Sequence, residues 1–333
     1  MERIASVDIF RFLAIASVIV IHTHYSNTHN LDIASVAEDQ FPRFAVPFFF
    51  AISGYFWGLK IRNADSPTPA SISMAKRILF LFLAWSAIYL FPFKYVPDIA
   101  NPVLMVKGAY WNVVNLAAHP LTLIMEGTKV HLWFLMGLLC SIATCLILVK
   151  YNRIKTLVAL SILLYAMGLL AKAYSPTPLG IHTTFNTRDG PFFGTIFFVS
   201  GYILSGLKPD ESWLGKGLLI MGFGFAMHFT ELYLLWRYYG QSPLQDYVIG
   251  TYFMGIGAAM VALSNHPLLR LEMFSGLGRL TLGIYAIHFA FVDMLSQGFK
   301  SLPWELLSLA VLFLSVTTAM ILSRNSITRR LVM

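Results

Sequence analysis

The chain has 333 residues, of which 57% are hydrophobic and only 12% are charged, and its mean hydropathy is +0.68. An ordinary soluble domain carries about 25% charged residues, so this composition excludes one, because a single soluble core cannot bury so many apolar side chains. The net charge of +8 is scattered among apolar segments and not clustered on a polar face, which excludes a nucleic-acid-binding protein.

Uncharged stretches of roughly 16–20 residues recur along the whole chain, as membrane-spanning helices require. We therefore predict an all-α, polytopic membrane protein that forms a single domain over residues 1–333, with about ten transmembrane helices. The connectors are rich in Pro, Asn and Asp, as is typical of loops. The predicted spans are 9–27, 43–60, 77–95, 131–150, 155–173, 190–207, 214–236, 247–265, 279–298 and 304–323.

The distribution of basic residues predicts the orientation of these spans. With ten spans, sixteen of the 24 Lys and Arg residues fall on the same side as the N-terminus. Because cytoplasmic loops are richer in Lys and Arg than external loops, we expect both termini to be cytoplasmic.

Residues 108–125 are also uncharged and long enough to span a membrane. They contain Asn112, Asn115, His119 and Pro120, which are unfavourable in lipid. An additional span here would also move the basic cluster that follows to the outside. We therefore interpret this segment as an amphipathic or re-entrant piece on the outer face.

The first predicted span carries two ionisable side chains that are rare in such segments, Arg11 and His22. Eleven helical residues turn through roughly 1100°, about 20° past three full turns, so both side chains lie on one helix face. Their separation along the axis is roughly 16 Å, about half the thickness of a bilayer core. This spacing indicates a cation near one membrane surface and a proton-transfer group well inside.

His22 is the leading catalytic candidate, because a neutral imidazole can take a proton from a hydroxyl group and later return it. The alternative is a structural histidine bonded to a backbone carbonyl, but the shared face with Arg11 favours the catalytic interpretation. Arg11 lies at the inner end, where it can bind a phosphate or pyrophosphate bidentately. Its alternative role is a positive-inside anchor paired with Asp8.

Further polar side chains are expected in the outer half of the bundle, at a depth similar to that of His22. His228 and Glu231 are three residues apart in the seventh span, and His131 begins the fourth span shortly after Glu126. We assign Glu231 to the catalytic group, because a carboxylate can orient His22 and stabilise its protonated form. The alternative is that Glu231 bonds His228 on its own helix.

At the inner mouth, Lys76 and Arg77 are candidates for binding a negatively charged donor, with a topological anchor as the alternative role. His288 lies near the middle of the ninth span, and its role is either a structural hydrogen bond or a contact with the substrate. The sequence contains no zinc-ligand spacing, Walker motif, dinucleotide fingerprint or nucleophile elbow, and we expect no metal.

Two segments share an internal similarity: PFFFAISGY at 47–55, and PFF with FVSGY within 191–202. The spacing from Pro to Ser differs between the two copies, which leaves a true repeat open. The simpler interpretation is that the small residues allow close packing of two helices.

Four stretches carry a family resemblance: DIFRFLA at 8–14 leading to His22, VPFFFAISGYF at 46–56, HLWFL at 131–135 and LGRLTLGIYAIH at 277–288. Together they resemble the acyltransferase-3 family, integral membrane acyltransferases that modify bacterial surface glycans. The first stretch fits the family's Arg-x10-His pattern, and the similarity covers nearly the whole chain. Many members have an Arg-x-x-Arg element after the second span, whereas this chain has Lys76-Arg77 followed by Phe80.

The resemblance implies acyl-CoA, most simply acetyl-CoA, as a cytosolic donor and a sugar hydroxyl of a lipid-linked or exported surface polysaccharide as acceptor. His22 would be the acid/base or a transient acyl carrier, in the bacterial inner membrane. In length the chain resembles the enterobacterial-common-antigen and O-antigen O-acetyltransferases. We expect the donor to contact Arg11, Lys76 and Arg77, and the acceptor to contact His131, Trp133 and His228.

Two other classes of function remain open at this point. One is a transporter or flippase of a lipid-linked glycan, with a proton relay through His22 and Glu231. The other is a non-catalytic membrane partner in glycan assembly. The expected partners are the glycan and membrane lipids and not nucleic acid, and a homo-oligomer is left open.

Overall fold

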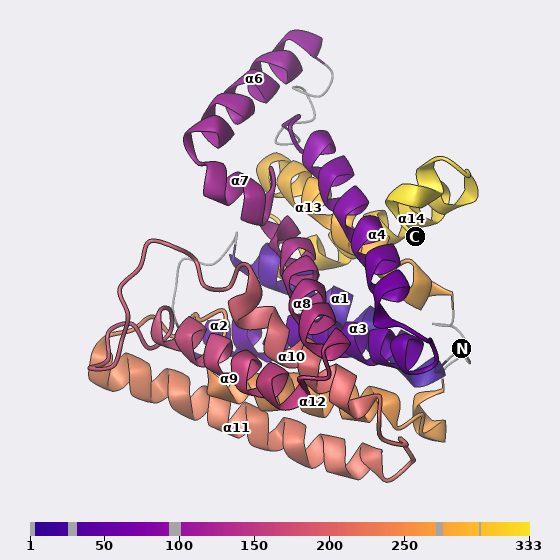
Figure 1. Ribbon diagram of the computed structural model, residues 1–333. Helices are drawn as coiled ribbons and strands as arrows, with labels where there is room; N and C mark the ends of the chain where they lie inside the picture. The colour runs from indigo at the N-terminus through magenta and orange to yellow at the C-terminus, as the bar shows by residue number, and fades with distance from the viewer. Residues whose placement is uncertain (1–3, 26–31, 93–100, 271–275, 300) are drawn as a thin grey trace.

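The computed structural model describes residues 4–25, 32–92, 101–270, 276–299 and 301–333. In these ranges the chain is helical and has no strand, which confirms the all-α prediction (Figure 1). Each of the ten predicted spans overlaps one α-helix, although the last residues of the first and third spans lie outside the described residues. The α-helices are α1 (Ala5–Tyr25), α2 (Ile33–Gln40), α3 (Ala45–Arg62), α4 (Pro67–Ile88), α6 (Pro102–Ala118), α7 (Pro120–Glu126), α8 (Trp133–Lys150), α9 (Ile154–Leu170), α10 (Pro191–Leu204), α11 (Trp213–Tyr239), α12 (Ile249–Leu263), α13 (Thr281–Gly298) and α14 (Trp304–Arg324).

Six helical segments in the described part of the chain are long and apolar enough to cross a membrane, and three shorter apolar helices accompany them. The chain is therefore a multi-pass membrane protein. The full number of crossings and the cytoplasmic location of both termini stay predictions. The six segments are Ala5–His24, Ile33–Arg62, Pro67–Ile88, Val130–Lys150, Trp213–Tyr239 and Trp304–Arg324, and the shorter helices are Ile154–Leu170, Pro191–Leu204 and Ile249–Leu263.

Helix α3 is central to the bundle and packs against α1, α4, α10 and α12. A Cβ atom added at Gly54 on α3 would lie 2.0 Å from the carbonyl oxygen of Phe198, and one added at Gly201 on α10 would lie 1.8 Å from that of Ala51. The two backbones therefore approach too closely for any side chain at these positions. These glycines belong to the two similar Ser-Gly-Tyr segments, so the prediction that small residues there serve helix packing is confirmed.

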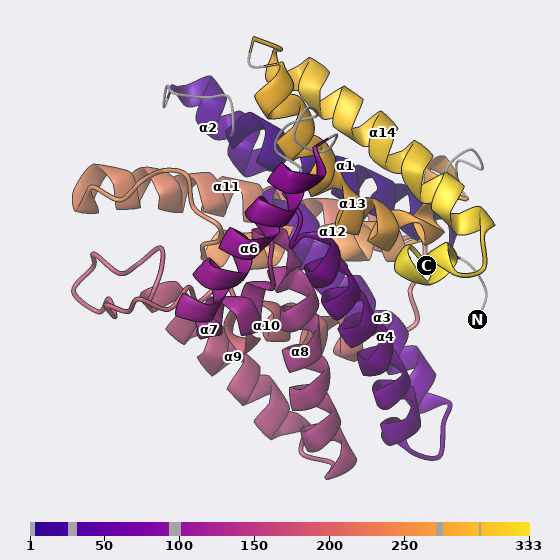
Figure 2. The same cartoon turned by 90° about the horizontal axis from the view of Figure 1, so that it is seen from above.

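Figure 2 shows α13 and α14 side by side along one side of the molecule, away from α9. Helix α14 also packs against α1. On the opposite side, α11 lies against α12, and glycines again allow the close contact: a Cβ atom at Gly250 would lie 2.3 Å from the backbone nitrogen of His228. Helix α11 ends at Tyr239 and is capped by Gly240, whose φ of 64° suits glycine.

The segment 108–125 folds into parts of two helices, α6 and α7, which meet at His119. Pro120 follows, and its ring prevents one continuous helix. Neither helix contains a buried residue, and α6 projects from the bundle (Figure 1). Asn112 of α6 donates a hydrogen bond to the carbonyl oxygen of Leu90, 2.7 Å away, just after the end of α4. The segment thus stands beside the bundle, and its amphipathic or re-entrant placement stays a prediction.

Candidate active site

Three histidines from three separate elements converge around Phe289. They are His22 on α1, His131 in the short 3-10 turn Val130–Leu132, and His288 on α13. The ring centroids of His22 and His288 are 5.4 Å apart, and those of His131 and His288 are 5.2 Å apart. The Phe289 ring lies 4.8 Å from His22 and 5.0 Å from His131, stacking on the latter. We call these three residues the histidine cluster.

Backbone carbonyl oxygens orient two of these rings. His288 Nδ1 lies 2.5 Å from the carbonyl oxygen of Tyr285, and His131 Nε2 lies 3.4 Å from that of Ala286. Within the described part of the chain, the other ring nitrogens, His288 Nε2 and His131 Nδ1, are buried and have no hydrogen-bond partner. Such orphaned buried polar atoms are rare in proteins and call for an explanation.

Tyr285 connects the histidine cluster with a cavity. Its hydroxyl donates a hydrogen bond to the carbonyl oxygen of His131, and its ring centroid lies 5.4 Å from that of His131 and 5.8 Å from that of His288. The same side chain lines a cavity of about 620 Å³ between α1, α3, α4, α8 and α13. The cavity therefore extends from the end of α3 to the edge of the histidine cluster.

The cavity is basic. Four of its lining residues are cationic, and none of the described lining residues is acidic: the cations are Arg11, Lys60, Arg77 and Arg279. Arg11 Nη1 lies 3.5 Å from Asp8 Oδ1, and its guanidinium stands 5.0 Å over the Phe56 ring. Because the charged side chains of the described lining are all positive, their electrostatic potentials add, and the cavity attracts anionic groups such as phosphates.

The sequence predicted part of this basic set. Arg11 and Arg77 line the cavity as expected, whereas the neighbouring Lys76 is exposed and is not among the described lining residues. This happens because successive helical residues point about 100° apart. Lys60 and Arg279 also line the cavity, although neither is among the donor-binding candidates predicted from the sequence. Lys60 lies near the end of α3 and Arg279 precedes α13, so the two side chains come together only through the packing of α3 against its neighbours.

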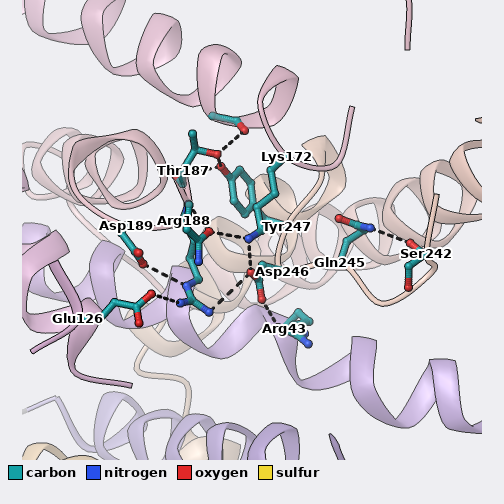
Figure 3. Close-up of polar contacts among 12 residues, drawn as sticks. Arg43, Glu126, Lys172, Thr187, Arg188, Asp189, Ser242, Gln245, Asp246 and Tyr247 are labelled. Carbon is teal, nitrogen blue, oxygen red and sulfur yellow. Dashed lines mark hydrogen bonds and ion pairs between the residues drawn. The ribbon is translucent and has the colours of Figure 1, made fainter. Parts of the chain in front are cut away.

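A second cluster of polar side chains lies at the opposite end of α3, where seven charged side chains form an ion-pair network. Figure 3 labels its members other than Asp39. Asp246 is its centre: Oδ1 lies 3.0 Å from Arg43, and Oδ2 lies 2.7 Å from Lys172 and 3.7 Å from Arg188. Arg188 also stands 4.9 Å over the ring of Trp133. The remaining members are Asp39, Glu126 and Asp189. The network joins α2, the end of α7 and the connectors that precede α3, α10 and α12.

The network shifts two carboxyl groups in opposite directions. Burial, followed by the charge of Asp189 and a hydrogen bond with it, raises the pKa of Glu126 to about 7, although Arg188 opposes this. Burial alone would also raise the pKa of Asp246. The cations Arg188, Lys172 and Arg43 outweigh that effect and hold its pKa well below the ordinary value.

His228 and Glu231 lie outside the histidine cluster. His228 Nε2 lies 2.9 Å from Gln40 Oε1, and Nδ1 lies 3.0 Å from the Thr251 hydroxyl, so both ring nitrogens have protein partners. Glu231 accepts hydrogen bonds from the Tyr174 hydroxyl at 2.5 Å and from the backbone nitrogen of Gly250 at 2.7 Å.

These contacts correct the expectation that Glu231 orients His22 or bonds His228. Equal depth along two helices does not make two side chains face each other. The ring of Trp133 packs against Arg188 and Phe193, next to the ion-pair network, although His131 lies only two residues earlier. Its contact with the acceptor stays a prediction.

All three histidines are candidates from the sequence, but the sequence does not predict that His131 and His288 lie close to His22. The only available signal was that each histidine lies in an apolar segment. Among the described residues, no group of three or more His, Cys, Asp or Glu side chains has an arrangement that could hold a metal ion.

Comparison with known proteins gives two kinds of match. Two curated proteins of Enterococcus faecalis named amino-acid racemase are similar: one is 29% identical over 220 residues, which is 61% of this chain and 28% of that protein, and the other is 26% identical over 211 residues, which is 60% and 29%. The chain thus spans less than a third of the length of these relatives, and the racemase name describes them alone. No solved structure gives a significant match. A family model described as an acyltransferase domain matches residues 4–324, nearly the whole chain. The chain therefore belongs to the acyltransferase-3 family.

Proposed function

We propose that this acyltransferase transfers an acyl group, acetyl in the first instance, from cytosolic acyl-CoA to a sugar hydroxyl of a lipid-linked or exported surface glycan. The observation that carries the proposal is the basic cavity, which reaches Tyr285 at the edge of the histidine cluster. An anionic donor in the cavity would lie next to the proton-transfer groups of the histidine cluster. The N-terminal end of α1 is then cytoplasmic, in the inner membrane of a bacterium.

The donor binds by its phosphates. Arg11, Arg77 and Arg279 are the guanidinium groups of the cavity, and Arg pairs bidentately with phosphate oxygens. Lys60 adds a fourth cation at the end of α3. Arg11 and His22 are separated by roughly 16 Å along α1. A donor that is bound by its phosphates at Arg11 must therefore extend toward Tyr285 for its acyl group to reach His22.

His22 performs the proton transfers. It accepts the proton of the acceptor hydroxyl as that oxygen bonds to the acyl carbon, and returns it to the sulfur atom that leaves. The acceptor gains an ester, the donor becomes a free thiol, and the protein ends unchanged. The packing of His22 against Phe289 and His288 keeps its ring in place for both steps.

The test is to express wild type, His22→Ala and His24→Ala in a host that lacks the gene, and to analyse surface glycans by mass spectrometry and NMR for ester-linked acyl groups. His24 is a matched control, because it is on the same helix but bonds Glu38, 3.1 Å away. We expect acylation by wild type and His24→Ala, and none by His22→Ala at equal membrane abundance. Equal acylation by all three would remove His22 from the mechanism. Changed glycan export without acylation would instead favour the transporter.

A further inference from the structure

We propose that His131 and His288 bind hydroxyl groups of the acceptor next to the one that is acylated, so that the site selects a polyol and not a simple alcohol. This inference rests on the proposed acyl transfer and assigns the acceptor specificity to two side chains. The observation behind it is the pair of orphaned nitrogens, His131 Nδ1 and His288 Nε2, in side chains that are 1% and 0% exposed.

The hydrogen bonds of the two rings determine what they can bind. A carbonyl oxygen can only accept, so His288 Nδ1 donates to Tyr285 and His131 Nε2 donates to Ala286. In a neutral imidazole the second nitrogen then carries a lone pair and accepts. The ligand must therefore supply two hydrogen-bond donors, which excludes a phosphate or an ionised carboxylate at this place.

The surroundings favour hydroxyl donors over a cationic donor. Lys129 Nζ stands 4.7 Å from the centroid of the Phe289 ring, on which His131 stacks, and pairs with Asp293. An ammonium group brought to this buried cluster would lose its hydration without gaining Asp293 as a partner, because Asp293 is already paired with Lys129. Neutral hydroxyl groups meet a smaller cost of burial.

The spacing fits one sugar ring. The His288 centroid lies 5.4 Å from that of His22 and 5.2 Å from that of His131. Because a hydrogen bond between heavy atoms spans about 2.8 Å, neighbouring hydroxyl groups of one ring can reach adjacent imidazoles. His22 then meets the reacting hydroxyl, and the other two histidines bind its neighbours.

The experiment compares acceptors of two kinds with purified protein in lipid nanodiscs and labelled acetyl-CoA. The polyol probes are the methyl glycosides of glucose, galactose, mannose and N-acetylglucosamine, and the simple alcohol is 1-hexanol. The variants are His131→Phe and His288→Phe, which remove the accepting nitrogen. Matched variants keep an acceptor: an amide oxygen can take the place of Nδ1 in His131→Asn and of Nε2 in His288→Gln.

We expect wild type to prefer at least one glycoside over 1-hexanol. Each Phe variant should raise the KM for that glycoside about tenfold, the size expected for one lost hydrogen bond, with the KM for acetyl-CoA unchanged. The Asn and Gln variants should recover most of the loss. A merely structural role would instead change both KM values or the abundance of folded protein.

The outcomes separate this inference from the proposed function. Transfer that depends on His22 but shows no preference for glycosides over 1-hexanol overturns the inference and leaves acyl transfer intact. An unchanged glycoside KM in both Phe variants does the same. Absence of His22-dependent transfer to every acceptor overturns both.

Discussion

The hydroxyl of Tyr285 donates a hydrogen bond to the backbone carbonyl of His131, while the ring of Tyr285 lines the basic cavity. One side chain thus holds the turn that carries a cluster histidine and also forms the inner wall of the proposed donor site. Tyr285→Phe should cost about 1 kcal/mol of stability and lower kcat, because a buried carbonyl oxygen loses its partner and the His131 turn shifts. The measurements are thermal unfolding in detergent and acyl-transfer kinetics.

Tyr165→Phe is the matched control for that change. Tyr165 is also buried and donates to a backbone carbonyl, that of Val248, 2.7 Å away, but it lies outside the cavity and the cluster. It should show a similar loss of stability with kcat preserved. A drop of kcat in both variants would mean that general loosening, and not the His131 turn, controls the rate.

Arg279→Ala should raise the KM for acyl-CoA about tenfold, because a charge-assisted hydrogen bond to phosphate is lost. Lys76→Ala, which removes a cation outside the described cavity lining, should change it by less than about twofold. Steady-state kinetics at constant ionic strength distinguish the two. Equal effects would indicate that net charge, and not the cavity, binds the donor.

Glu126 should make stability depend on pH. Its pKa is raised in the folded chain from 4.5 to about 7, so the folded state holds the proton more tightly than the unfolded state. Its contribution is therefore greatest below pH 4.5 and is lost as the pH rises toward about 7. Glu126→Gln should remove this loss. The expected gain above pH 7 is about 2 kcal/mol, because solvent screening of this partly exposed group reduces the full value of about 3 kcal/mol. Unfolding midpoints of both proteins between pH 4 and 8 check this, and parallel curves would contradict it.

Asp246→Asn should destabilise the protein by about 2–4 kcal/mol, because it leaves three partly buried cations of the network without their shared carboxylate. The control is Asp210→Asn, since Asp210 is exposed and bonds only nearby residues of its own loop. That change should shift the unfolding midpoint little. Similar midpoints for the two variants would show that the network adds little to stability.

Gly54→Ala should destabilise by about 1–3 kcal/mol, because the new methyl group meets the carbonyl oxygen of Phe198. Gly222→Ala on α11 is the control, because a Cβ atom there has no neighbour within 4 Å. It should be neutral or stabilise by up to about 1 kcal/mol, since Ala favours helix. Both are measured by thermal unfolding, and a tolerated Gly54→Ala would mean that α3 and α10 can separate.

Structural features that depend on a single helix can be predicted from the sequence. The helical segments follow from apolar length, and the common face of Arg11 and His22 follows from helix geometry alone. The packing role of Gly54 and Gly201 can also be predicted, because small residues repeated in apolar segments indicate close helix contacts.

What depends on several helices was not predicted. Glu231 shares its helix with His228, yet its carboxylate bonds Tyr174 and Gly250, because the rotation of α11 in the bundle decides which neighbour it meets. Asp246 and Arg188 lie in connectors 58 positions apart, and no periodicity relates them. The meeting of His131 with His288 likewise depends on how α8 and α13 pack.

The ion-pair network and the basic cavity lie at opposite ends of α3, with Arg43 just before the helix and Lys60 near its end. The 18 residues of α3 therefore separate the two sites by about 27 Å along the helix axis. Asp246 holds the Arg43 end of α3 through one ion pair, and Lys172 and Arg188 tie Asp246 to the connector before α10. Gly54 and Gly201 hold the middle of α3 against α10. A bulky ligand entering the cavity should therefore displace the Lys60 end of α3 more than the Arg43 end.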